Sequence, residues 1–162
     1  MHYFEFAQKD ATLYEGAATQ SVNTGLDEIL EITKDMNDAA TVINVSRVLI
    51  KFDLNYISSS VSSGSIPSNA KYYLNLYDAH PSGLATSQVL YAHPVSGSWT
   101  MGDGHSYDSP TTTEGSSWIY RYGKINGRLW LNTVSASGGQ WFSGSGYEAS
   151  QSFDRKTLDV RM

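Results

Sequence analysis

Strict alternation of side chains with a period of two, which is the period of a β-strand, runs through residues 47–54 and 70–77. One side of the first segment carries Val48, Ile50, Phe52 and Leu54. Its other side carries Arg47, Leu49, Lys51 and Asp53. In the second segment Ala70, Tyr72, Leu74 and Leu76 alternate with Lys71, Tyr73, Asn75 and Tyr77. We therefore expect a half-buried strand at 47–54 and a second central strand at 70–77.

Shorter strand candidates cover residues 89–93, 118–122, 128–131 and 158–162, each bounded by Gly, Pro, Ser or Asn. Residues 29–33 alternate as a strand and contain β-branched side chains, although a helix over 26–35 is the alternative. A short turn of helix is predicted at 54–60. Residues 58–68 and 135–146 are rich in Ser and Gly and are predicted to be long surface loops. The predicted fold is all-β, an antiparallel β-sandwich of jelly-roll type.

The length of the chain limits its organisation. With 162 residues, of which 40% are hydrophobic, the chain can bury a sizeable core, so we expect one domain spanning residues 1–162. There is no cysteine, so disulfides and thiolate metal sites are excluded. A net charge of -5 without a basic cluster argues against nucleic acid as a partner. No apolar stretch is long enough for a membrane helix, and residues 1–6 lack the pattern of a signal peptide, so we expect no membrane insertion and no export by the usual route.

Several motifs follow one another in a fixed order. They are Lys9-Asp10-Ala11-Thr12-Leu13, Asn23-Thr24-Gly25, Ile29-Leu30-Glu31-Ile32, residues 47–54 and residues 70–77. Trp99, Ser117-Trp118, Trp130 and Gly138-Gly139 follow in the second half. This series resembles the DNRLRE-type domain, a β-sandwich similar to carbohydrate-binding modules. The resemblance implies that the listed segments are core strands and turns of that sandwich.

Two features depart from that family. Gln140 stands after the glycine pair where the family commonly has Asp, which argues against an acidic ligand there. Family members also continue past the strand that resembles residues 157–162, so a final segment is expected to be missing or supplied by a partner. Within the family, the start of the chain together with Ser46-Arg47-Val48-Leu49-Ile50-Lys51-Phe52 is similar to structural proteins of large tailed phages of marine bacteria. That resemblance implies a virion protein.

Catalytic and metal-binding patterns are sparse. The densest polar cluster, residues 103–108, contains Asp103, His105 and Asp108, and its two carboxylates are the candidates for a calcium site. The alternative is a polar loop in which the Asp side chains cap turns, and on that interpretation no metal or other cofactor is bound. No Gly-x-Ser-x-Gly elbow is present, and nothing selects a catalytic pair among the 16 acidic residues. We therefore expect a protein that is not an enzyme, with glycan depolymerase as a minor alternative.

Aromatic residues are the remaining candidates for a functional surface, because 4 Trp and 11 Tyr suit stacking on sugars or packing against proteins. Trp99 and Trp118 lie in strand-like contexts and are predicted to be core residues. Trp130, Trp141 and Tyr147 lie in or beside the Gly/Ser-rich loops and are the candidate contact residues.

The aromatic residues of 70–77 fall on both faces of one predicted strand, as in a sandwich that packs against a neighbour. The sequence thus suggests a virion structural protein that forms homo-oligomers, docks to other virion proteins and also contacts a host surface glycan. The alternative is a polysaccharide-binding module at the bacterial cell surface or in a secreted protein.

Overall fold

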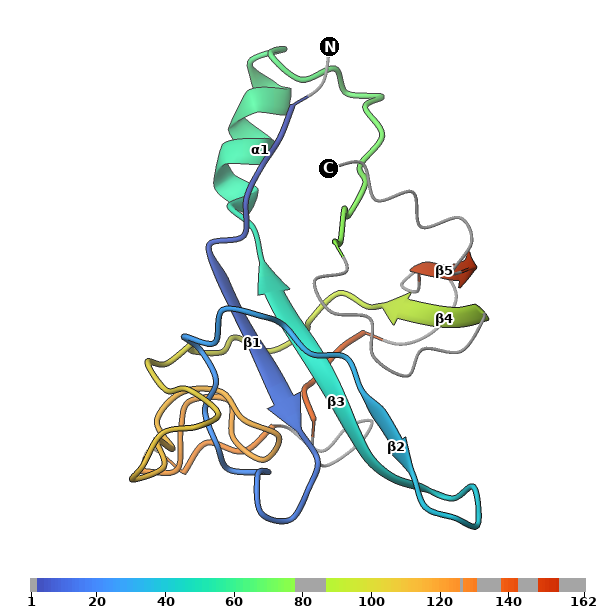
Figure 1. Cartoon of the computed structure of the whole chain (residues 1–162). Helices are drawn as coiled ribbons and strands as arrows, with labels where there is room; N and C mark the ends of the chain where they lie inside the picture. Colours follow the sequence, from blue (N-terminus) through green and yellow to red (C-terminus); the bar gives the residue numbers. More distant parts are fainter. Residues whose placement is uncertain (1–2, 78–86, 126, 131–137, 143–148, 155–162) are drawn as a thin grey trace. The chain divides into compact units, whose positions relative to one another are not determined.

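The structure is a computed structural model that describes residues 3–77, 87–125, 127–130, 138–142 and 149–154 (Figure 1). Its elements, in chain order, are β1 (Lys9–Tyr14), β2 (Lys34–Met36), β3 (Val42–Lys51), α1 (Leu54–Ser62), β4 (Ser87–Ala92) and β5 (Ala149–Asp154). All strand pairs are antiparallel, so an all-β chain with antiparallel sheets is confirmed. Within the described ranges, no helix has the length and apolar character needed to cross a membrane.

The chain divides into two compact units. The first comprises Met1–Ala70 and Val95–Gln140, and the second comprises Lys71–Pro94 and Trp141–Met162. The first unit contains a three-stranded sheet in the order β1-β3-β2, so that β3 lies between its two neighbours (Figure 1). The second unit contains the two-stranded sheet of β4 and β5.

The core of the first unit lies on the Leu49 side of β3. Ala11 lies opposite Leu49 in the register of β1 and β3, and opposed residues of an antiparallel pair point to the same face. These residues belong to one buried cluster, whose members are Ala11, Leu13, Leu49, Trp99, Trp118 and Trp130. Val48 and Ile50, on the more apolar side of the alternation, are only partly buried.

Arg47 explains why the alternation is a poor guide to the buried face. Its guanidinium carbon lies 4.7 Å from the centroid of the Trp118 ring, and its Nη1 donates a hydrogen bond to the Gly138 carbonyl oxygen at 2.9 Å. Burial lowers the pKa of Arg47. A guanidinium that stacks on an aromatic ring and donates to a carbonyl can occupy the core side of a strand, so a charged residue does not mark the solvent side here.

The prediction of a strand through residue 54 is wrong at its end, because β3 stops at Lys51 and α1 begins at Leu54. The Asp53 carboxylate caps the helix by accepting hydrogen bonds from the backbone N–H groups of Asn55 at 3.0 Å and Tyr56 at 3.1 Å. The predicted short turn of helix at 54–60 is confirmed. It extends to Ser62, so the first part of the predicted 58–68 loop is helical.

Residues 29–33 form neither the predicted strand nor the alternative helix. Side chains replace a regular ladder here: the Thr33 backbone N–H donates to Ser46 Oγ at 2.7 Å, and the Glu31 N–H donates to Thr12 Oγ1 at 3.1 Å. Regular pairing with β3 begins only at Lys34 and shifts register between Asp35 and Met36. The predicted strand at 70–77 is also not formed, since residues 71–77 have no regular secondary structure.

The remaining predicted strands have mixed outcomes. The strand predicted at 89–93 corresponds to β4, and its partner β5 was not predicted. Residues 118–122 and 128–130 share only an isolated bridge between Tyr120 and Leu129. Residues 138–142, the described part of the predicted 135–146 loop, contain no regular strand. Residue 131 and the predicted strand at 158–162 lie outside the described residues.

Candidate functional site

A fully buried asparagine, Asn23, links two loops of the first unit. Its Nδ2 donates hydrogen bonds to the carbonyl oxygens of Met101 at 2.6 Å and Ser116 at 2.9 Å. Its Oδ1 accepts a hydrogen bond from the Gly104 N–H at 2.8 Å. A single amide therefore fixes residues 101–104 against residues 114–116, and it uses both its donors and its acceptor to do so.

Gly102 and Gly115 let these two loops come so close. Both adopt positive φ angles, +84° and +109°, which side-chain-bearing residues rarely adopt. A Cβ on Gly102 would lie 2.3 Å from Asn23 Oδ1, and one on Gly115 would lie 2.4 Å from Asn23 Nδ2. The hydrogen bonds of Asn23 to the two loops, which we call the Asn23 bracket, consequently require glycine at positions 102 and 115. The backbone at these two positions is not covered by a side chain of its own.

Backbone hydrogen bonds connect these two loops to the neighbouring residues 121 and 128. The Ser116 N–H donates to the Thr100 carbonyl at 2.7 Å, and the Thr100 N–H donates to the Arg121 carbonyl at 3.0 Å. The Arg121 N–H in turn donates to the Arg128 carbonyl at 2.9 Å. Backbone hydrogen bonds thus join the chain around residues 100, 116, 121 and 128, and a β-bridge pairs Tyr120 with Leu129.

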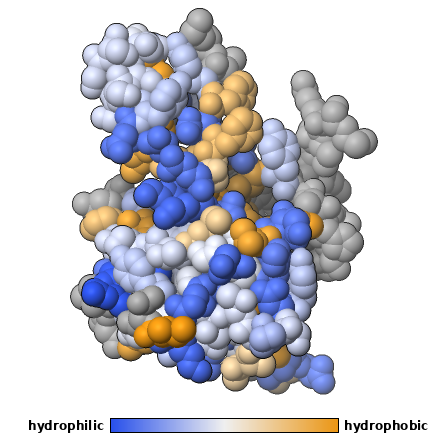
Figure 2. All heavy atoms as spheres, turned by 90° about the vertical axis from the view of Figure 1, so that its left-hand side faces the viewer, coloured by the Kyte–Doolittle hydropathy of each residue, from blue (hydrophilic) through white to orange (hydrophobic). Residues whose placement is uncertain are grey.

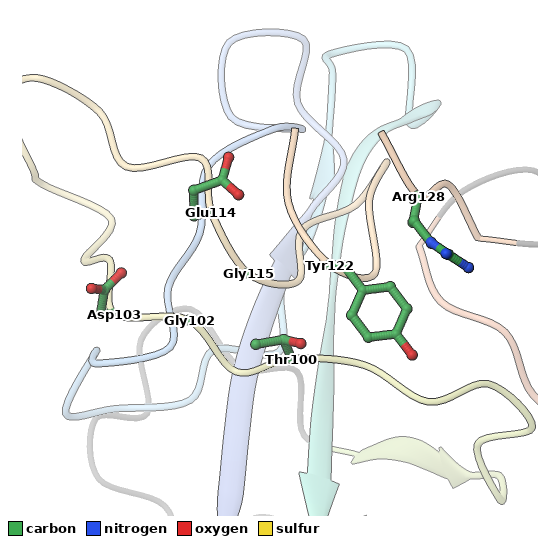
Figure 3. A pocket seen from close by; sticks show the side chains of 7 residues that line it. All are labelled: Thr100, Gly102, Asp103, Glu114, Gly115, Tyr122 and Arg128. Carbon is green, nitrogen blue, oxygen red and sulfur yellow. The ribbon is translucent and has the colours of Figure 1, made fainter. Parts of the chain in front are cut away.

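These segments surround a pocket of about 630 Å³ (Figure 3). Its side chains are Thr100, Asp103, Glu114, Tyr122 and Arg128, and Gly102 and Gly115 contribute bare backbone. Figure 3 shows Asp103 and Glu114 toward one end of the pocket and Arg128 at the other, with Thr100 and Tyr122 between them. The pocket is open, so much of this volume faces solvent.

Two of the lining side chains are held in place by neighbours. Glu114 Oε1 accepts a hydrogen bond from the Ile125 N–H at 3.0 Å. The Tyr122 hydroxyl is hydrogen-bonded to the Ser98 hydroxyl, and the Arg121 guanidinium carbon lies 5.1 Å from the Tyr122 ring centroid. The Glu114 carboxylate and the Tyr122 ring are therefore each oriented by their own neighbours.

The two residues of the predicted calcium site have different environments. Asp103 is exposed and lines the pocket. Asp108 accepts hydrogen bonds from the His105 N–H at 2.8 Å and from Thr112 Oγ1 at 2.9 Å, and these bonds lower the pKa of its carboxyl group. Asp108 thus caps its own loop, as in the alternative interpretation of this cluster. Among the described residues, no group of three His, Asp or Glu side chains is arranged to hold a metal ion.

The candidate contact residues also differ from one another. Trp99 and Trp118 are buried, as predicted. Trp130 is not a surface residue, because it is only 2% exposed and its Nε1 donates to the Ser117 carbonyl at 2.9 Å. The Gly/Ser-rich sequence near Trp130 resembles a surface loop, so the sequence did not indicate that this side chain is in the core. Trp141 is half-buried, with its ring centroid 6.1 Å from that of His93, and Tyr147 lies outside the described residues.

The sequence did not indicate Glu114, Tyr122 or Arg128 as site residues. It indicated Asp103 only as a candidate calcium ligand. A signal was nevertheless present, because Gly102-Asp103 and Glu114-Gly115 each place an acidic side chain next to a glycine. Glycine permits the close backbone approach that a pocket wall requires. The sequence could not show that Asn23 joins the two pairs.

The sequence matches no family model, and comparisons with curated proteins and with solved structures also give no match.

Proposed function

We propose that the protein is a non-enzymatic structural component of a tailed-phage virion, which docks to copies of itself and to other virion proteins. The observation that carries this proposal is the exposure of the segment 71–77. Its large apolar and aromatic side chains, Tyr72, Tyr73, Leu74, Leu76 and Tyr77, are between 46% and 89% exposed. Five exposed side chains of this type within seven residues are typical of an interaction surface.

The alternation within this segment supports a docking role of a particular kind. Its residues have the period of a strand, yet side chains from both sides of the alternation are exposed. A segment that has the pattern of a strand and pairs with no other strand among the described residues is suited to pairing with another chain. Further apolar side chains are exposed elsewhere, including Phe4 and Phe6, and Figure 2 shows apolar residues at several places on one face.

The resemblance to phage structural proteins supports the same function and suggests its setting. A capsid decoration, neck, tail or fibre protein requires docking surfaces and no catalytic centre. We propose a jelly-roll-type antiparallel β-sandwich as the fold that accompanies this role, and the virion as the location. Contact with a host surface glycan is part of the proposal, since many weak contacts add up on a particle with many copies.

The proposal is tested by measuring the mass of the purified chain by light scattering at micromolar concentration, with and without calcium. We expect a defined oligomer. The double variant Leu74→Lys and Leu76→Lys places two like charges in the segment and should shift the protein to monomer. The free energy of unfolding of the double variant should differ from that of the wild type by no more than about 0.5 kcal/mol, as for other exposed positions.

Ile125→Lys is the matched control, because Ile125 is 84% exposed but lies outside the segment. It should leave the oligomer intact. A wild-type protein that is monomeric at these concentrations would contradict the proposal and favour the polysaccharide-binding module. A large loss of stability in the double variant would also contradict it, because the segment would then belong to the core of its own chain.

A further inference from the structure

We propose that residues 71–77 of one copy pair, as an added strand, with the free edge of β2 in a second copy. The inference rests on the proposed function and deepens it, because it names the two surfaces through which copies of the chain dock. Its first support is the position of β2. In the order β1-β3-β2, β3 is paired on both sides and β2 forms one edge of the sheet (Figure 1). An edge strand has unpaired N–H and C=O groups, to which a further strand can bind.

The opposite edge of this sheet, at β1, is closed near its centre. The Thr12 N–H donates a hydrogen bond to Thr24 Oγ1 at 2.9 Å, and the Thr24 hydroxyl donates to the Thr12 carbonyl oxygen at 2.7 Å. Both residues are fully buried. A side chain of the same chain therefore occupies the place that an added strand would need, and β2 is the edge that can accept one.

Lys34, in the middle of the edge, directs its backbone groups away from β3. Its register partner is Val45. The Val45 carbonyl accepts from the Glu15 N–H at 3.0 Å, and the Val45 N–H donates to Glu15 Oε2 at 3.0 Å, so the backbone groups of Val45 face the β1 side. In an antiparallel pair, the residue opposite such a position directs its own N–H and C=O outward. Within the described ranges, no residue outside the sheet forms a backbone hydrogen bond with Lys34.

The side chains along this edge are also uncovered. Residues 31–40 are all exposed, and the exposed fractions of Ile32 and Met36 are 51% and 54%. Residues 71–77 are likewise all exposed and have no regular secondary structure. Their tyrosines are favoured in strands, and their period is that of a strand. Pairing the two segments would remove apolar surface from water on both sides of the contact.

The charges select residues 71–77 of a second copy as the occupant of the edge. Residues 31–38 contain one Lys and three acidic side chains, a net charge of -2, whereas residues 71–77 contain one Lys and no acid. Two β2 edges placed together would bring like net charges side by side, which is unfavourable, and the pairing with 71–77 brings opposite ones together. Each copy supplies one such segment and one such edge, so the copies need no other protein to pair.

The test is a cross-link between one acceptor cysteine and one donor cysteine, which is specific because the chain contains no cysteine of its own. Lys34→Cys and Asn75→Cys are purified separately, refolded together from urea and treated with a short bismaleimide, whose span tolerates neighbouring registers. On a denaturing gel we expect at least about fivefold more covalent dimer than with the control pair Ile125→Cys and Asn75→Cys. Ile125 is 84% exposed and belongs to neither segment.

A further variant removes only the backbone donor at the edge. Lys34→Pro deletes the outward N–H, which β3 does not use, and edge strands tolerate proline. Light scattering over a range of concentrations should show association at least about tenfold weaker than for Lys34→Ala, which keeps the N–H and loses the same charge. Urea unfolding of both variants verifies that each is folded.

Three results would overturn the inference. The first is an oligomer by mass without a cross-link between positions 34 and 75 above the control, and this result leaves the assembly proposal standing. The second is a folded Lys34→Pro that associates as tightly as Lys34→Ala. The third is a cross-link within single chains of the double variant Lys34→Cys and Asn75→Cys at nanomolar concentration, because the chain's own segment would then occupy the edge. A wild-type chain that is monomeric by mass contradicts the assembly proposal itself.

Discussion

At the scale of single residues, Asn23 is the position on which most of the described site depends. Replacing it by Ala leaves the Met101 and Ser116 carbonyls and the Gly104 N–H without their partner in a buried place. Each such group costs about 1–3 kcal/mol, so we expect Asn23→Ala to lower the free energy of unfolding by about 3–5 kcal/mol in a urea titration.

Asn23→Asp is a sharper variant at the same position. It keeps the acceptor for Gly104 and the size of the side chain, but it removes the two donated bonds and points a carboxylate at two carbonyl oxygens. Its loss of stability should be at least as large as that of Asn23→Ala. The exposed control Asn55→Ala should remain within about 0.5 kcal/mol of the wild type, and similar losses at both positions would show that Asn23 has no special role.

Asp10 gives a prediction that depends on pH. Burial raises the pKa of its carboxyl group above the value in the unfolded chain. The folded protein therefore binds this proton more readily, and at neutral pH the ionised carboxylate opposes folding. Asp10→Asn should raise the melting temperature at about pH 7, and the gain should shrink as the pH falls through the raised pKa toward about pH 3.

The exposed Asp38→Asn is the control for Asp10, and it should raise the melting temperature much less. Thermal unfolding of both variants at the two pH values provides the comparison. A lower melting temperature of Asp10→Asn at neutral pH would show that the Asp10 carboxylate has a stabilising partner.

At the scale of elements, the stability of α1 depends more on the cap formed by Asp53 than on burial of its side chains. None of its residues is buried, and no basic side chain lies in its last turn, so the Asp53 cap is its main local support. Asp53→Ala should cost about 1 kcal/mol, which speeds hydrogen exchange of the α1 amides about fivefold. Asp53→Asn should restore most of the protection, and an unchanged exchange rate in Asp53→Ala would contradict the capping role.

The elements also show what the sequence could and could not predict. Alternation identified the body of β3, and the resemblance indicated β1, because a ladder needs only local period and β-prone residues. The alternation alone does not identify the core face of β3, because Arg47 is accommodated against Trp118 on that face. The predicted strand extends past the end of β3 because Phe52 and Leu54 continue the alternation, whereas the cap at Asp53 is a side-chain contact that alternation does not show.

At the scale of the whole molecule, the pocket could not be predicted because two of its loops, at residues 101–104 and 114–116, are joined by the distant Asn23 side chain. Local sequence indicated glycine-linked acids at 102–103 and 114–115, and the burial of Trp99 and Trp118 was predicted from their contexts. The burial of Trp130 depends on a hydrogen bond to Ser117, which a loop-like sequence does not reveal. Long-range contacts therefore decided the parts of the structure that the local pattern left open.

The Asn23 bracket has a consequence for the order in which the protein folds. Its two donated bonds join residues separated by 78 and 93 positions, so they add strongly to the contact order. During synthesis, Asn23 emerges long before its acceptors at Met101 and Ser116, and its amide must remain hydrated until they arrive. The first unit should consequently fold late and cooperatively, and the loops at residues 101–104 and 114–116 should become ordered in the same kinetic step as the tryptophan core.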